Sequence, residues 1–166
     1  MIQRIQTLYL LLVGALGITL CFVPVVQFVT PEGAEVVRAW QLTALGMTET
    51  TVTELPAIPL NGLWGLLLAS ALIPVLALVD IFLYNKRLLQ ARLNIFTIML
   101  CLGYYGVLAI YIYLAKLIYL AKLMIDVDVY VMGWACLPLV CLVLTVMATR
   151  RILKDEAMVR AADRLR

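Results

Sequence analysis

Long hydrophobic runs without charge alternate with short charged connections along this chain. Every residue between Glu54 and Asp80 is uncharged, and the block Gly62–Ile73 within this run is almost wholly apolar. The hydrocarbon core of a bilayer, about 30 Å thick, needs about 20 apolar helical residues to cross it, and a helix satisfies its own backbone N–H and C=O groups where lipid cannot. Each run therefore predicts a membrane-spanning helix. The pattern predicts four spans, at about 5–26, 60–84, 93–115 with an extension to about 124, and 129–149.

The connection at 28–54 is the only long hydrophilic one. Thr30–Gly33 is a turn signal, and strand formers flank it at 25–29 and 35–42. This pattern predicts a β-hairpin that turns at Pro31–Gly33, to which 50–53 could add a third strand. The alternative is an irregular loop that covers the bundle.

Small residues and prolines indicate where the spans pack or bend. Gly14, Ala15 and Gly17 would let a neighbouring helix approach the first span closely. Pro24 is expected to kink or end this helix near its far side. Pro138 falls in the middle of the predicted fourth span.

The third span does not stop where its uncharged run stops. Tyr113–Ile118 is followed by Tyr119–Met124, a tandem copy with one change. A continuous helix over 93–124 would be about 48 Å long, which exceeds the thickness of the bilayer. We therefore expect this helix to project past the membrane. Local duplication is a sufficient explanation for the repeat itself.

Acidic residues lie near the ends of two predicted spans. Asp80 is one turn before the end of the second span. An acid there is a candidate proton relay or ion site; the alternative is a side chain near the interface that is solvated or paired with Arg87 or Arg92. Asp126 and Asp128 in the last connection could ligate a cation or simply form a polar turn.

The distribution of positive charge predicts the orientation. Four spans place the N-terminus, the 85–92 connection and the tail on one side, and ten of the 13 Lys and Arg residues lie there. Basic residues near short loops stay cytoplasmic, so both termini are expected in the cytoplasm. The tail, 150–166, has the pattern of an amphipathic helix that would lie on the membrane surface or dock on a partner. The residues expected to contact a partner or the membrane surface are Arg150, Arg151, Lys154, Arg160, Arg164 and Trp40.

Composition removes most catalytic and metal chemistry. Hydrophobic residues make up 65% of the chain, well above the share of about 45–50% in soluble domains. Histidine, the commonest general base and metal ligand, is absent. All four cysteines fall within predicted spans, where they are expected as free thiols. We expect no enzyme activity, no cofactor, no metal site and no nucleic-acid partner.

The two ends of the chain carry a resemblance. Met1–Tyr9 and Lys154–Arg166 resemble the signature ends of domain-of-unknown-function family 4293, small four-span inner-membrane proteins of Bacteroidota. The resemblance implies one membrane domain over residues 1–166 and an inner-membrane location. It implies no activity and no site residue, and the tandem at Tyr113–Met124 departs from the pattern expected of the family.

Two functions fit an all-α membrane protein with a small β-hairpin in its first extracytoplasmic loop and an amphipathic C-terminal helix. The first is a non-catalytic subunit or an assembly or scaffold factor of a membrane-protein complex, which would use the 28–54 loop or the tail as its interaction surface. The alternative is a binder or carrier of a lipid or small molecule, which would need polar groups at mid-bilayer. Ser70, Thr97 and Thr145 are the candidates, and each is expected to hydrogen-bond within its own helix.

Overall fold

A computed structural model describes the backbone of residues 2–29, 39–49, 64–83, 87–123 and 128–164. Four α-helices dominate it: α1 (Ile2–Phe22), α2 (Trp64–Phe82), α3 (Arg87–Leu123) and α4 (Leu137–Arg164). Four short strands and one 3-10 helix complete the described part: β1 (Val26–Val29), β2 (Ala39–Thr43), β3 (Gly46–Glu49), β4 (Asp128–Val131) and η1 (Gly133–Cys136).

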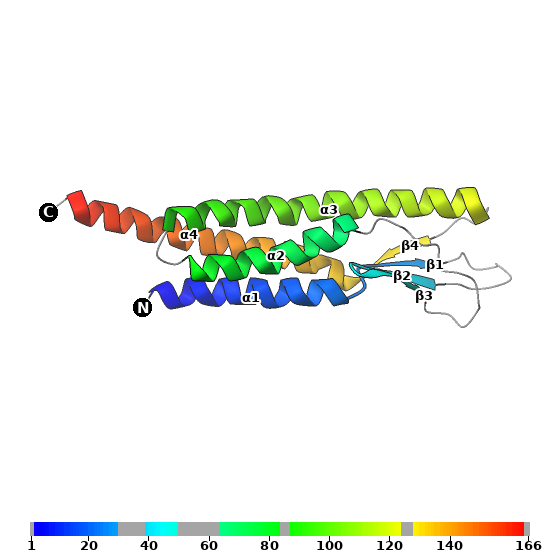
Figure 1. The fold of residues 1–166 in the computed structure, drawn as a ribbon, viewed down its shortest axis with the longest axis horizontal. Helices are drawn as coiled ribbons and strands as arrows, with labels where there is room; N and C mark the ends of the chain where they lie inside the picture. The colour runs from blue at the N-terminus through cyan, green and yellow to red at the C-terminus, as the bar shows by residue number, and fades with distance from the viewer. Residues whose placement is uncertain (1, 30–38, 50–63, 84–86, 124–127, 165–166) are drawn as a thin grey trace.

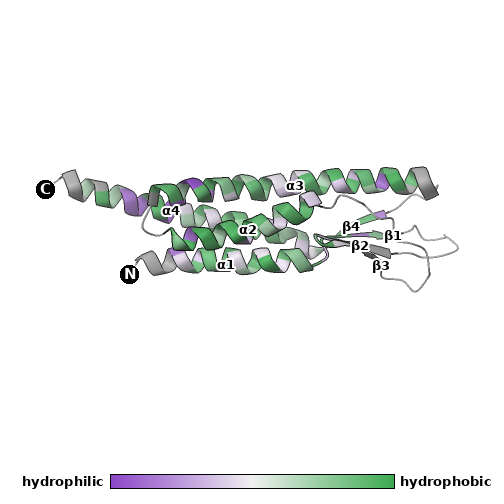
Figure 2. Cartoon of the chain, in the orientation of Figure 1, coloured by the Kyte–Doolittle hydropathy of each residue, from purple (hydrophilic) through white to green (hydrophobic). Residues whose placement is uncertain are grey.

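The helices form a four-helix bundle in which each helix packs against two others. α1 contacts α2 and α4, and α3 contacts the same two helices from the other side. Both chain ends lie at one end of the bundle, which we call the terminal end, and the strands lie at the opposite end, the sheet end (Figure 1). Three helical segments are long and apolar enough to cross a membrane, Trp64–Phe82, Leu88–Ile118 and Gly133–Val159, whereas the apolar segment of α1, Gln6–Phe22, is shorter. Hydrophobic residues cover most of each helix (Figure 2).

The strands form one antiparallel sheet with the order β3-β2-β1-β4. β1 pairs with β2, with Val26 opposite Leu42, so the predicted strand pair is confirmed; its turn at Pro31–Gly33 lies outside the described residues, as does the predicted third strand at 50–53. The third strand that is observed is β3, which follows β2 directly.

β4 corrects the prediction for the last connection. Residues 128–131 were expected to end a turn and begin the fourth span, but they form a strand whose Val131 lies opposite Val26 of β1. The first residue of α4 is consequently Leu137 instead of Val129. Pro138 then falls in the first turn of the helix, where its missing N–H costs nothing, and not in the middle of a span.

The sheet and the bundle share one hydrophobic core. Val26, Phe28 and Leu42 of the sheet are fully buried in the same cluster as Leu66 of α2 and Tyr104 of α3. The sheet therefore caps the bundle instead of hanging from it on flexible connections.

The closest described approach of backbone to side chain between helices is at Gly17 of α1. A Cβ placed on Gly17 would lie 2.8 Å from Cδ of Pro74 in α2. The prediction of close packing holds at this position only: Gly14 is buried with nothing within 4 Å of its Cβ direction, and Ala15 is exposed. α1 ends at Phe22, two residues before Pro24, as expected.

α3 and α4 are longer than a membrane requires. α3 has 37 residues and runs through the tandem repeat without a break, which confirms the continuous helix predicted there; at about 1.5 Å per residue it is about 55 Å long. α4 has 28 residues and includes the predicted tail, so the tail is helical but continues in line with the fourth span instead of turning onto the membrane surface (Figure 1).

Candidate functional site

Buried polar side chains gather toward the terminal end of the bundle. Asp80 closes the inward face of α2, and Asn94 lies on the inward face of α3; both are 0% exposed. The other helices contribute further buried polar groups at or near the same end: Gln6, Gln90, Thr97, Thr145 and Thr149.

One hydrogen bond fixes the relative heights of α2 and α3 at this end. Nε2 of Gln90 donates to the backbone oxygen of Asp80 over 3.0 Å. Asn94 follows Gln90 by four residues, so it lies on the same side of α3 and about 6 Å farther toward the sheet end. Asp80 and Asn94 therefore belong to the same α2–α3 interface, one helical turn apart in height.

The side chains of Asp80 and Asn94 lack hydrogen bonds. Within the described ranges, neither carboxyl oxygen of Asp80 and neither amide atom of Asn94 has a partner. A buried polar group without a hydrogen bond costs roughly 2–7 kcal/mol, and an isolated carboxylate costs far more. Such a cost needs a reason, because native interiors satisfy nearly all their polar groups.

This environment corrects the structural interpretation of Asp80. A solvated side chain was expected, or one paired with Arg87 or Arg92. Instead Asp80 is fully enclosed and Arg92 is exposed to the outside. The side chain of Arg87 lies outside the described residues.

A stripe of α3 carries this polarity into the bundle. Its buried positions follow helical spacing, from polar at the terminal end to apolar at the sheet end: Gln90, Asn94, Thr97, Cys101, Tyr104 and Leu108. The hydroxyl of Tyr104 has no partner among the described residues either. The periodicity of this stripe is visible in the sequence and could have identified Asn94, which sequence reasoning missed.

The hydroxyls that were candidates for a ligand site serve their own helices. Ser70 donates to the carbonyl of Leu67 over 3.0 Å, and Thr97 donates to Leu93 over 3.1 Å. Thr145 donates to the carbonyl of the residue four positions earlier over 2.7 Å. The predicted pairing within each helix is thus confirmed.

α4 is tied to its neighbours near both ends of the bundle. Toward the sheet end, the hydroxyl of Tyr105 donates to the carbonyl of Ala135 over 2.8 Å and accepts from the N–H of Leu139 over 3.1 Å. At the terminal end, Nε2 of Gln6 donates to Oδ2 of Asp155 over 2.6 Å. The second bond holds the start of α1 against the extension of α4.

The residues predicted to contact a partner do not form one patch in the described structure. Arg150, Arg151 and Lys154 are exposed on α4 just beyond the terminal end of the span. Arg160 and Arg164 continue the same helix, and Trp40 lies in β2 opposite Phe28; the side chains of these three residues lie outside the described residues.

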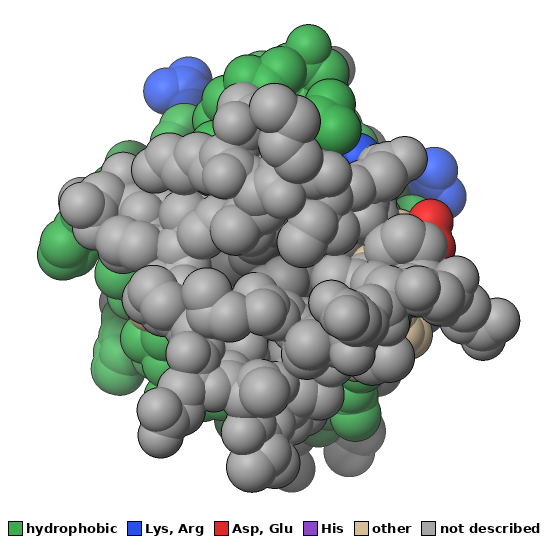
Figure 3. Space-filling model, turned by 90° about the vertical axis from the view of Figure 1, so that its right-hand side faces the viewer, with side chains coloured by type: hydrophobic (Ala, Val, Ile, Leu, Met, Phe, Trp, Pro, Cys, Tyr) green, Lys and Arg blue, Asp and Glu red, His purple; other side chains and the backbone are tan. Residues whose placement is uncertain are grey.

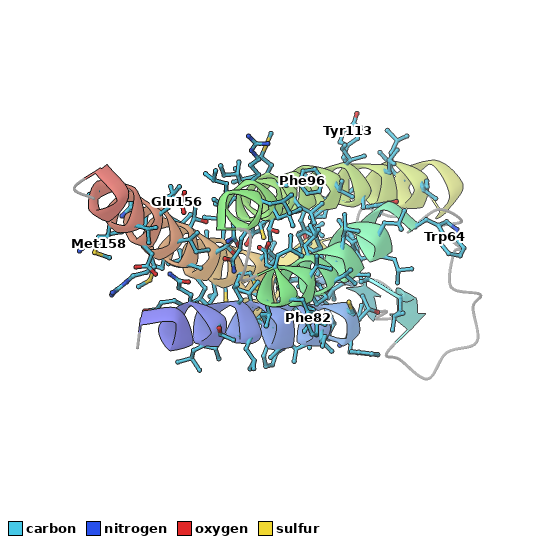
Figure 4. The ribbon with its side chains drawn as sticks, turned by 60° about the vertical axis from the view of Figure 1, so that its left-hand side comes forward. Trp64, Phe82, Phe96, Tyr113, Glu156 and Met158 are labelled. Carbon is cyan, nitrogen blue, oxygen red and sulfur yellow. The ribbon has the colours of Figure 1, made fainter. Side chains whose placement is uncertain are left out.

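The sheet-end part of α3 exposes apolar side chains beyond the start of α2. A Cβ on Gly65, the second residue of α2, would lie 3.2 Å from the hydroxyl of Tyr111, so α3 reaches the start of α2 near Tyr111. The rest of α3, which we call the α3 overhang (Ile112–Leu123), adds about 18 Å. Tyr113 points away from the bundle (Figure 4) and is 68% exposed, and Leu117 and Leu120 are 51% and 58% exposed.

This face of the overhang continues the outward face of the span. Ile95, Met99 and Leu102 are exposed at helical spacing earlier in α3, in phase with Tyr113 and Leu117. A view onto the sheet end shows hydrophobic side chains at the upper rim, where α3 runs (Figure 3).

Cysteines and acids form no recognisable chemical centre in the described ranges. No group of three or more His, Cys, Asp or Glu residues there could hold a metal ion. All four cysteines are free thiols. Asp128 is exposed in β4, and Asp126 lies outside the described residues.

Apolar helices of membrane-crossing length, capped at one end by a small sheet, define a helical membrane protein. The sequence matches the family described as Domain of unknown function (DUF4293) over residues 2–165, and the chain belongs to that family. The resemblance carried by the two ends of the chain is thereby confirmed. No curated protein matches the chain.

Proposed function

We propose that this protein is a non-catalytic subunit or assembly factor of a membrane-protein complex. It crosses the bacterial inner membrane four times, with both termini in the cytoplasm. The observation that carries the proposal is the apolar surface of the α3 overhang.

The height of the bundle supports the membrane placement. Gln90 is level with the end of α2 and Tyr111 with its start. The 21 steps of helix between them span about 32 Å, close to the thickness of a hydrocarbon core of about 30 Å. Exposed Arg92, Arg150 and Arg151 lie at the terminal end, which supports a cytoplasmic location for that end.

Reporter fusions test the orientation. Alkaline phosphatase fused after residue 166 should be inactive, and the same enzyme inserted at 44–45, between β2 and β3, should be active. Green fluorescent protein should show the opposite pattern. A phosphatase active at the C-terminus would contradict the orientation.

In this placement the α3 overhang stands in water. Tyr113, Leu117 and Leu120 then have no lipid to cover them, although burying one large apolar side chain is worth about 1.5–3 kcal/mol. Exposed apolar surface of this kind marks protein interaction sites. A second membrane protein that covers the overhang would gain this free energy, and its own spans would extend the contact along the outward face of α3.

Photo-crosslinking in the native membrane tests the partner role. A photoreactive phenylalanine analogue at Leu117 should give one discrete protein adduct that mass spectrometry identifies. The matched control places the analogue at Leu68, which is 62% exposed on α2 but lies within the span and should react with lipid. Equal adducts at both positions, or none at Leu117, would contradict the proposal.

The second candidate function is a lipid or small-molecule binder. It is favoured by the enclosed polar groups of Asp80, Asn94 and Tyr104, none of which has a described hydrogen-bond partner. Mass spectrometry of the protein purified in mild detergent separates the two: a stoichiometric lipid or quinone without protein would favour the binder, and a stoichiometric protein would favour the subunit.

A further inference from the structure

We propose that Asp80 and Asn94 form a proton-binding site between α2 and α3, in which the carboxyl group of Asp80 is held as the neutral acid. This inference does not depend on the partner role of the α3 overhang. It rests on the enclosure of both side chains, on their four unpartnered atoms and on the directions of the two helices.

The two side chains tilt toward one another along the bundle. Every Cα–Cβ bond in a helix tilts toward the N-terminus of that helix. α2 runs toward the terminal end and α3 runs away from it, so Asp80 tilts toward the sheet end and Asn94 tilts toward the terminal end. Because Asn94 lies one turn nearer the sheet end than Gln90, which contacts Asp80, the two tilts converge on the same height.

One proton balances the hydrogen-bonding groups of this pair. The unpartnered atoms are two carboxyl oxygens, one amide oxygen and one amide nitrogen. A carboxylate would offer only acceptors, which leaves the amide oxygen of Asn94 facing negative charge. The neutral acid donates its O–H to that oxygen and accepts an N–H at its other oxygen, so that every one of the four atoms gains a partner.

The charged groups around the site leave the carboxyl without a described cation. On α3, Arg92 is exposed, and on α4, Arg150, Arg151 and Lys154 are exposed, while Asp155 accepts a hydrogen bond from Gln6 of α1. The side chains of Arg4 on α1 and Arg87 on α3 lie outside the described residues, so the test includes the nearer of the two. No charged residue within the spans faces Asp80 from the sheet end: the inward positions of α2 and α3 there are Ala77, Ile73, Thr97 and Cys101.

The binding step itself is simple. A proton from water at the terminal end forms an O–H bond with one oxygen of Asp80, the charge of the carboxylate is cancelled, and no other group changes charge. A proton needs no cavity, which fits an interface in which both side chains are fully enclosed.

Infrared spectroscopy of the full-length protein in lipid tests the proposal, because the carbonyl stretch of a neutral carboxylic acid is separate from those of carboxylates and amides. At neutral pH the wild type should show this band, and Asp80→Asn should lose it entirely. Asp155→Asn, a matched change at a partly exposed acid, should leave it unchanged. Asn94→Val removes the proposed partner and should shift the band to higher frequency, which keeps the proposal testable if Asp80→Asn does not fold.

Three results would overturn the proposal. The first is the absence at neutral pH of any neutral-acid band that depends on Asp80. The second is a band that appears only in Arg87→Gln, which would mean that Asp80 is an ionised partner of Arg87. The third is a band that disappears when sodium chloride is added at constant pH, which would assign the site to a metal cation.

Discussion

The contact between Gly17 and Pro74 predicts that one added methyl group will separate α1 from α2. In Gly17→Ala the new Cβ would lie 2.8 Å from Cδ and 3.1 Å from the backbone nitrogen of Pro74, whereas carbon atoms pack best at about 3.5–4.0 Å. The proline ring cannot rotate away, because it is closed onto its own backbone. Overpacking of this kind costs about 1–3 kcal/mol.

Gly14→Ala is the matched control for this substitution. Gly14 is three residues earlier on the same helix and is also buried, but its added Cβ would meet nothing within 4 Å. Both substitutions gain up to about 1 kcal/mol of helix propensity, so this gain cancels in the comparison. Gly17→Ala should therefore be less stable than Gly14→Ala by about 1–3 kcal/mol.

Unfolding of the purified protein in mixed detergent micelles, followed by circular dichroism, measures this difference. The midpoint should fall for Gly17→Ala and remain equal or rise for Gly14→Ala. Equal stability of the two variants would refute the packing argument, because the local chemistry of the two substitutions is the same.

The bonds and exposures along α4 give three further expected outcomes. Tyr105→Phe should lower the free energy of unfolding by about 1–3 kcal/mol in the same assay, because it leaves backbone groups of α4 without partners. Gln6→Ala should release the extension of α4, and hydrogen exchange should become faster after Asp155. A membrane-permeant maleimide should alkylate exposed Cys136 severalfold faster than buried Cys141, as measured by mass spectrometry of the intact protein.

Each of these outcomes has a clear contradiction. Tyr104→Phe is the control for Tyr105→Phe, because the hydroxyl of Tyr104 has no described partner and its removal should cost nothing; equal losses would count against the bond to α4. Unchanged exchange in Gln6→Ala would show that the clasp does not hold the extension. Equal alkylation rates would contradict the burial of Cys141.

The helices were predictable because hydrophobic runs and charges are local signals. The continuous third helix, the strand pair at 26–29 and 39–43, and the end of α1 before Pro24 all follow from nearby residues. β4 was missed for the opposite reason: a four-residue strand carries almost no pattern, and its partner lies about 100 residues earlier. Pro138 was the available signal, since a proline at the second position of a helix is favourable.

The candidate site was only partly predictable. Asp80 stood out as an acid within a span, but its enclosure depends on how α2 and α3 are set against each other, which a single sequence does not specify. Asn94 belongs to a buried stripe whose helical spacing is in the sequence, yet nothing local distinguishes it from an amide that faces outward. The extended direction of the tail likewise depends on the bond between Gln6 and Asp155, two residues at opposite ends of the chain.

The position of β1 between β2 and β4 has a consequence for synthesis of the protein. β1 leaves the ribosome about 100 residues before β4, an interval of about 5–20 s at about 5–20 residues per second. β2 can pair with one edge of β1 early, but the other edge stays open through the synthesis of α2 and α3. Open edges recruit strands from other chains, so nascent chains that stop within α3 should be the form most prone to aggregate, and completion of β4 is the step that ends this exposure.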